Sequence, residues 1–80
     1  MGINEFRYYA LRTMCEAHLW GIGEEDTFTL KGLTYNIKLE YRGANFYPFV
    51  LRVNNGSKPM CFRTIGELFH HIFESRMISY

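Results

Sequence analysis

The sequence has little of several features that usually identify a function. Two cysteines, Cys15 and Cys61, are too few for the disulfide framework of a small secreted domain, so we expect free buried thiols in a reducing cytoplasm. Nine basic and eight acidic residues give a net charge of +1, which excludes a strongly acidic nucleic-acid mimic and binding of nucleic acid through net charge alone. No apolar run approaches the ~20 residues that cross a bilayer, and no secretion signal opens the chain, so we expect neither membrane insertion nor export.

Motifs that carry catalysis are also missing. The sequence has no glycine-rich phosphate loop, no paired carboxylates and no serine-centred turn. His70 and Glu74 have a spacing that can bind a metal on a helix, but a site needs a third protein ligand and no second cluster is visible. Cys15 and His18 lie one helical turn apart, yet Cys15 adjoins an apolar stripe, where a thiol is unreactive. We therefore expect no enzyme, no metal and no cofactor.

What the chain does have is apolar and aromatic material for one core. Hydrophobic residues make up 48% of the 80 residues, and seven Phe, six Tyr and one Trp are among them. A chain of this length forms one domain with one core, so we expect a single domain over residues 1–80.

The clearest pattern is a strict alternation of apolar and polar residues over 33–42. The apolar members are Leu33, Tyr35, Ile37, Leu39 and Tyr41, and the polar members are Thr34, Asn36, Lys38, Glu40 and Arg42. A period of two places all apolar side chains on one face of a strand, so the pattern predicts the central strand of a sheet with one covered face.

Three further strands are predicted at 27–31, 46–53 and 58–62. A two-residue turn at Lys31 and Gly32, an odd-length loop after residue 41 and a tight turn at Asn55 and Gly56 keep the apolar faces matched. The predicted partners are Leu30 with Leu33, Phe28 with Tyr35, Leu39 with Phe49, Ile37 with Leu51, Leu51 with Met60 and Phe49 with Phe62.

Two amphipathic helices are predicted to flank the sheet. The first spans 3–20 with Asn4 as its N-cap, and the second follows a capping box formed by Thr64 and Glu67. The first helix is expected to bury Phe6, Ala10, Met14 and Ala17, widened by Leu11, Cys15 and Leu19. The second is expected to bury Ile65, Leu68, Phe69, Ile72 and Phe73 and to expose His70, His71 and Glu74.

The predicted fold is α+β, a four-stranded antiparallel β-meander with an N-terminal and a C-terminal α-helix. Packing both helices on the apolar sheet face gives two layers. The alternative, one helix on each side, is less favourable because the outer face offers few apolar residues.

The surfaces left free by this fold predict the binding residues. The outer sheet face carries four basic residues and, in the predicted strands, Glu40 as its one acid, and several aromatic residues exceed what the core can hold. Exposed aromatic residues are expected at Tyr8, Tyr9, Trp20, Phe46, Tyr47 and Tyr80. The predicted partner-binding residues are Lys31, Lys38, Arg42, Arg52, Tyr47, Trp20 and Phe46.

Residues 35–71 resemble the central part of an SH2 domain. The Tyr-x-Ile-x-Leu strand is followed by hairpins and by Phe62-x-Thr64-Ile65-x-Glu67-Leu68-x-x-His71, which resembles the entry to the second helix of that family. The resemblance implies a peptide-binding domain. Lys31 stands where the family has its phosphate-binding arginine, and the phosphate loop of the family would have to fit into Gly32.

A second resemblance is to small inhibitors of host defence carried by phages and mobile elements, anti-CRISPR proteins among them. It covers the size, the α-β-meander-α plan and the segment Thr64-Ile65-Gly66-Glu67-Leu68. It implies a cytoplasmic, non-enzymatic protein that blocks a surface of a larger protein or protein–nucleic acid complex, within a host cell if a phage encodes it. The alternatives are a nucleic-acid-binding module that uses the outer sheet face and a divergent SH2-like domain, and a homodimer is compatible with each.

Overall fold

The computed structural model describes residues 2–40, 47–54, 56 and 58–78. The chain contains two helices and a four-stranded antiparallel sheet, in the predicted order α-β-β-β-β-α. The elements are α1 (Ile3–Glu16), its 3₁₀ continuation η1 (Ala17–Leu19), β1 (Glu25–Leu30), β2 (Leu33–Leu39), β3 (Phe49–Val53), β4 (Met60–Phe62) and α2 (Ile65–Ile78). Because the strands lie in the order β1-β2-β3-β4, the predicted α+β meander is confirmed.

The strand register follows the alternation of the sequence. Leu30 lies opposite Leu33, Ile37 opposite Leu51 and Leu51 opposite Met60, as predicted. The turn between β1 and β2 places Lys31 at φ 49° and Gly32 at φ 82°. Two successive left-handed residues match the twist of a two-residue hairpin, which fixes the register of the pair.

The ends of the strands differ from the prediction. β1 begins at Glu25 rather than at residue 27, because Leu39 N–H donates to Glu24 O at 3.0 Å and Gly23 N–H donates to Leu39 O at 2.8 Å. β2 ends at Leu39, β3 begins at Phe49 and β4 begins at Met60, so all three strands are shorter than predicted. Arg42 and Phe46 lie outside the described residues.

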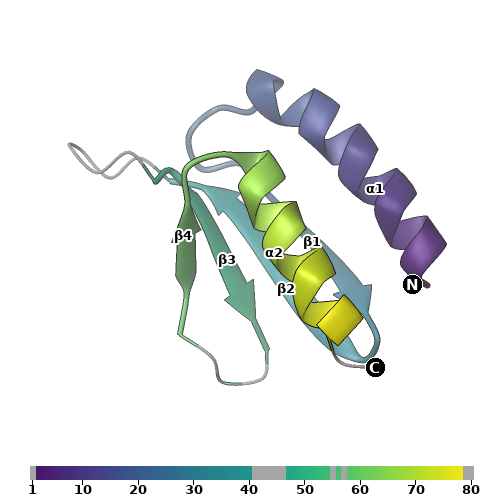
Figure 1. Cartoon of the computed structure of the whole chain (residues 1–80). Coiled ribbons are helices and arrows are strands. Elements are labelled where there is room, and N and C mark those ends of the chain that lie inside the picture. The colour runs from purple at the N-terminus through teal and green to yellow at the C-terminus, as the bar shows by residue number, and fades with distance from the viewer. Residues whose placement is uncertain (1, 41–46, 55, 57, 79–80) are drawn as a thin grey trace.

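Both helices cover the same face of the sheet, as Figure 1 shows, and they run in roughly opposite directions. The residues of the core come from both helices and from the inward positions of β1, β2 and β3. They are Phe6, Tyr9, Ala10, Phe28, Leu30, Tyr35, Ile37, Leu51, Leu68, Phe69 and Ile72. The two-layer packing is therefore confirmed, and the alternative with one helix on each side is wrong.

The rotation of α1 about its axis differs from the prediction. Tyr9 and Thr13 are buried, whereas Leu11, Cys15 and Leu19 are exposed. The Tyr9 ring packs at 4.9 Å from the Phe28 ring, so this tyrosine belongs to the core and not to the surface aromatics. The two thiols are free, as predicted, but the expectation that they are buried is wrong, since Cys15 and Cys61 are both exposed.

The helix ends are only partly as predicted. Gly2, not Asn4, is the N-cap of α1, and no side chain caps it. The α-helix ends at Glu16, where η1 takes over, and Gly23 at φ 98° then turns the chain toward β1. At α2 the predicted cap is confirmed on its hydroxyl side, because Glu67 N–H donates to Thr64 Oγ1 at 3.1 Å.

The outer sheet face contains one fully buried residue that the alternation assigned to solvent. Val50 is 0% exposed, although it points away from both helices. Val50 lies opposite Lys38 of β2, and Arg52 is its neighbour on the same face of β3. Just before β3 begins, Glu40 N–H donates to Pro48 O at 2.7 Å. On the same face, Arg52 Nη2 lies 3.4 Å from Glu40 Oε1, so the side chains of Arg52 and Glu40 meet near Val50.

Candidate functional site

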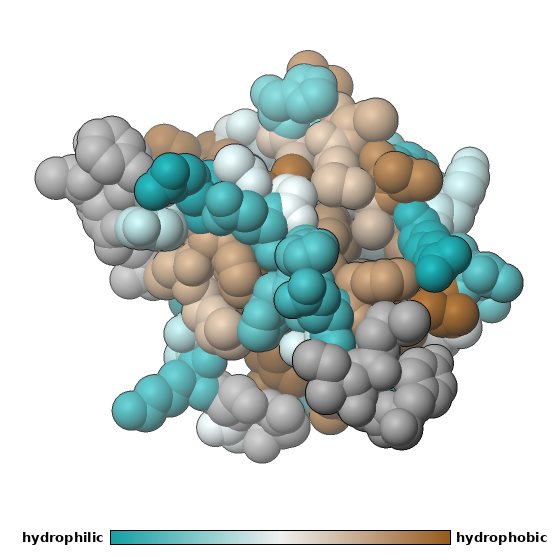
Figure 2. All heavy atoms as spheres, viewed as in Figure 1, coloured by the Kyte–Doolittle hydropathy of each residue, from teal (hydrophilic) through white to brown (hydrophobic). Residues whose placement is uncertain are grey.

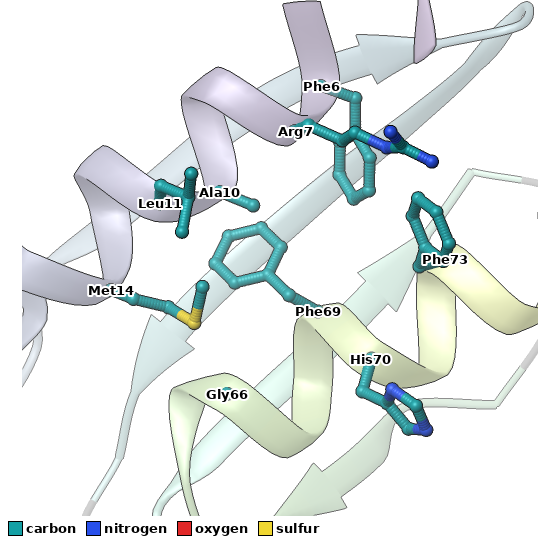
Figure 3. A pocket seen from close by; sticks show the side chains of 9 residues that line it. All are labelled: Phe6, Arg7, Ala10, Leu11, Met14, Gly66, Phe69, His70 and Phe73. Carbon is teal, nitrogen blue, oxygen red and sulfur yellow. The ribbon is translucent and has the colours of Figure 1, made fainter. Parts of the chain in front are cut away.

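A groove lined mainly by apolar side chains lies between α1 and α2. Its volume is about 370 Å³. Figure 3 shows its lining side chains, all of which come from the two helices. They are Phe6, Arg7, Ala10, Leu11, Met14, Gly66, Phe69, His70 and Phe73. Figure 2 shows hydrophobic atoms gathered between the helices, beside the hydrophilic ridge of α2.

Aromatic packing beneath the helices provides the floor of the groove. The Phe6 and Phe69 rings lie 5.9 Å apart, and Phe6 also lies 5.7 Å from the Phe28 ring on the sheet. These bulky rings meet at the sheet surface, while the small side chain of Ala10 fills little of the space above them. The groove therefore has a packed aromatic base and an open top.

Gly66 leaves the groove open at the end where α2 begins. A Cβ atom at this position would lie 3.7 Å from Met14 Sδ and 3.8 Å from Thr64 Oγ1, which is ordinary van der Waals contact. Close packing therefore does not require glycine here, and a longer side chain would extend into the groove. This position controls how much of the groove is free without controlling the fold.

The opposite end of the groove is basic. Arg7 places its guanidinium carbon 5.0 Å from the centre of the Phe73 ring, an arrangement that joins α1 to α2 by a cation–π contact. His70 Nε2 lies 2.9 Å from Glu74 Oε1 on the exposed side of α2. Among the described side chains, Arg7 and His70 are the ionisable ones that line the groove, and none of these lining side chains is a carboxylate that would oppose an acidic ligand.

Several large apolar side chains on and after α1 are exposed. Tyr8 and Leu11 are 70% and 63% exposed, and Leu19 and Ile22, beyond the end of α1, are 81% and 74% exposed. Of these, Leu11 also lines the groove. Leu11 is therefore an exposed apolar side chain at the edge of the groove, whereas Leu19 is an exposed apolar side chain outside its lining.

The basic residues of the outer sheet face are partly neutralised. Arg52 Nη2 lies 3.4 Å from Glu40 Oε1. Because β1 starts earlier than predicted, Glu25 also lies on this face, opposite Lys38, and its Oε2 lies 3.5 Å from Asn36 Nδ2. The expectation that Glu40 is the one acid of this face is therefore wrong.

The other predicted binding residues are spread over several parts of the fold. Lys31 is exposed in the β1–β2 turn, and Lys38 is half-buried on β2. Tyr47 is 40% exposed and has the Arg63 guanidinium 5.6 Å from its ring centre. Trp20 is partly buried and packs against the core, so it is not a freely exposed aromatic.

The histidines and cysteines do not assemble a reactive centre in the described part of the chain. No group of three or more His, Cys, Asp or Glu side chains that could hold a metal occurs among those residues. In the predicted metal-spaced pair, His70 Nε2 lies 2.9 Å from Glu74 Oε1. The His71 ring, which is predicted to be exposed, packs 5.4 Å from the Phe62 ring. Within the same described ranges, no helix is long and apolar enough to cross a membrane.

The groove itself was missed because its residues look like core residues in the sequence. Leu11 and Met14 were assigned to the buried stripe of α1, and nothing in their spacing distinguishes a groove wall from a core contact. Gly66 inside the first turn of α2 was the available signal, since glycine is unfavourable in a helix and its presence there calls for a reason. Comparisons with protein-family models, with curated protein sequences and with solved structures find no match to this chain, so no known family assigns a role to the groove.

Proposed function

We propose that the protein is a non-enzymatic binding module that holds an amphipathic helix of a partner protein in the groove between α1 and α2. The observation that carries this proposal is the open, aromatic-floored groove of about 370 Å³, whose apolar lining has no covering segment among the described residues. Helices pack with their axes about 8–10 Å apart, so a third helix can rest on two splayed ones and insert its apolar side chains between them.

The charge of the lining favours a protein helix with acidic residues beside its apolar face. Arg7 and His70 line the groove, and no carboxylate of a described residue does. An open groove along two helices also suits an elongated ligand better than a compact one, because small-molecule sites enclose most of the ligand surface.

The mode of action predicted from the sequence is retained, but the surface that binds the partner is a different one. Occupation of a surface on a larger protein remains the proposed mode of action, but the groove replaces the outer sheet face. Support for that replacement comes from Glu25 and Glu40, which oppose the basic residues of the sheet, and from Trp20, which packs on the core.

Selection of binders from a displayed library of helical peptides tests the proposal. We expect enriched peptides to carry apolar residues at i, i+3 or i+4, and i+7, which is the spacing of one helix face. Leu11→Glu should abolish their binding, whereas Leu19→Glu should not. Both leucines are exposed and only Leu11 lines the groove, so the two variants are matched in chemistry and in tolerance by the fold.

A second matched pair fills the groove instead of charging it. Gly66→Leu should block the selected peptides, whereas Glu67→Leu, at the neighbouring exposed position outside the lining, should leave binding intact. Peptides without helical apolar spacing, or equal binding to all four variants, would overturn the proposal.

Two other ligands could occupy the groove, a second copy of the chain or a lipid, and experiments distinguish each of them from a helical peptide. Sedimentation velocity that detects a dimer of the wild type and a monomer of Leu11→Glu would show that a second copy covers the groove, and would overturn the peptide proposal. Binding of dodecanoate that Gly66→Leu abolishes, without any peptide binding, would point to a lipid site and would overturn it too.

The narrower suggestion of a phage-type inhibitor of host defence has its own test. Expression of the protein in bacteria that carry a CRISPR defence, followed by infection with a targeted phage, should restore plaques if the suggestion is correct. Under the groove proposal, Leu11→Glu should remove that protection and Leu19→Glu should retain it. Absence of protection by the wild type would contradict this role for the defence system tested.

A further inference from the structure

Building on the proposed helix-binding role of the groove, we infer that Arg7 determines which helices bind, by selecting an acidic residue at one end of the apolar face of the partner. The two ends of the groove differ in chemistry. Arg7 and Phe73 form one end, and Met14 and Gly66 form the other. We therefore expect the first end to select a ligand by its charge and the second end to select it by the size of its side chain.

Arg7 differs from Arg12 and Arg52, which have carboxylate partners, and resembles Arg63, whose guanidinium lies 5.6 Å from the centre of the Tyr47 ring, away from the groove lining. Arg12 lies 3.9 Å from Glu16, and Arg52 lies 3.4 Å from Glu40. No ion pair of Arg7 occurs among the described residues, and its guanidinium lies over the Phe73 ring. The positive charge of Arg7 is therefore left for a ligand.

The contact with Phe73 also prepares Arg7 for that role. A guanidinium stacked on an aromatic ring is held in place while its in-plane N–H groups stay available, and those N–H groups match the two oxygens of a carboxylate. Because the ring belongs to α2 and the arginine to α1, the guanidinium is held across the mouth of the groove. Less side-chain entropy is lost on binding when the cation is already positioned.

His70 does not supply an equivalent cation. Its Nε2 lies 2.9 Å from Glu74 Oε1, so a carboxylate already accompanies the imidazole. Among the side chains that the structure describes, the ionisable groups at this end of the groove are thus Arg7 from α1 and His70, with its partner Glu74, from α2. Of these, Arg7 is the group whose charge is not balanced by the protein.

Two synthetic peptides with the same leucine spacing test the inference, one flanked by glutamates and one by lysines. We expect the wild type to bind the glutamate peptide about fivefold more tightly, the size of one exposed charge pair. Arg7→Glu should reverse the preference. Arg12→Glu is the matched control, because Arg12 is on the same helix and does not line the groove, and it should leave the preference unchanged.

The outcomes separate this inference from the proposed function. Equal affinity of the wild type for both peptides, or the same preference in Arg7→Glu, would overturn the role of Arg7 while the groove remains a helix-binding site. Binding of neither peptide would overturn both. A preference that Arg7→Gln reduces, that Arg7→Glu reverses and that shrinks at high salt would establish charge selection, since exposed ion pairs are screened by salt.

Discussion

The hydroxyl of Tyr9 donates a hydrogen bond of 2.5 Å to Asp26 Oδ2 and so joins the middle of α1 to β1. The Tyr9 ring also packs on Phe28 of β1 and on Phe69 of α2, so this residue joins α1 both to the sheet and to the other helix. This contact fixes which side of α1 faces the sheet. It therefore also fixes which side, with Leu11, is left to line the groove.

Replacement of Tyr9 by phenylalanine should lower the free energy of unfolding by about 1–2 kcal/mol, the usual net value of a hydrogen bond to a charged group that keeps some access to water. Urea denaturation measures the change. Tyr8→Phe is the matched control, because Tyr8 is 70% exposed, and it should unfold as the wild type does. Equal midpoints for the two variants would mean that the Tyr9 hydroxyl contributes nothing to stability.

Stability at alkaline pH should depend on the same hydroxyl. Burial, the hydrogen bond to Asp26 and the negative charge of Asp26, in that order, raise the pKa of Tyr9 above its ordinary value. Above pH ~10, the ordinary tyrosine value, the unfolded chain loses this proton while the folded chain keeps it, so stability falls as the pH rises further.

The pH effect is measured as the difference between the wild type and Tyr9→Phe in urea titrations at several pH values. The advantage of the wild type should be constant at neutral pH and should shrink above pH ~10. An advantage that stays constant throughout the alkaline range would show that the Tyr9 proton is not linked to folding.

Sequence reasoning predicted the sheet better than it predicted the site, and the reason is physical. The pairing of Ile37 with Leu51 follows from a period of two and from turn length, both of which are local properties. The rotation of α1 is not local, because that helix has apolar residues on nearly every side. Contacts of Tyr9 with Asp26 and Phe28 decide between these sides, and they depend on where β1 lies.

The groove was harder still to predict, since it depends on the distance between two helices far apart in sequence. Met14 and Gly66 become neighbours only in the folded chain. The outer sheet face was predicted in outline, but the start of β1 at Glu25 changed its charge, and a strand end is the least certain part of a sequence-based assignment.

Val50 should behave as a core residue in spite of its outward position. Val50→Thr keeps the shape of the side chain and places a hydroxyl where the residue is 0% exposed, so we expect a loss of about 1–3 kcal/mol. Thr34→Val, on the same sheet face but only half-buried, should change stability by less. Thermal unfolding of both variants measures the contrast, and an unaffected Val50→Thr would mean that water reaches this position.

Nucleic-acid binding by the outer sheet face should be weak. Arg52 is paired with Glu40, and Glu25 shares the face with Lys38, so the described strands of this face offer phosphates little unbalanced positive charge. We expect fluorescence anisotropy with a single-stranded oligonucleotide of about 20 nucleotides to give little binding near physiological salt. Lys38→Glu should then change nothing.

The contrary result has a distinct signature. Each phosphate contact contributes a slope of about −0.7 to a plot of log affinity against log salt concentration for a single strand. Tight binding with a steep slope, lost in both Lys38→Glu and Arg52→Glu but retained in Leu11→Glu, would assign the function to the sheet face. The groove variant is the decisive control here, because it leaves the charge of the outer face unchanged while disabling the proposed site on the opposite face.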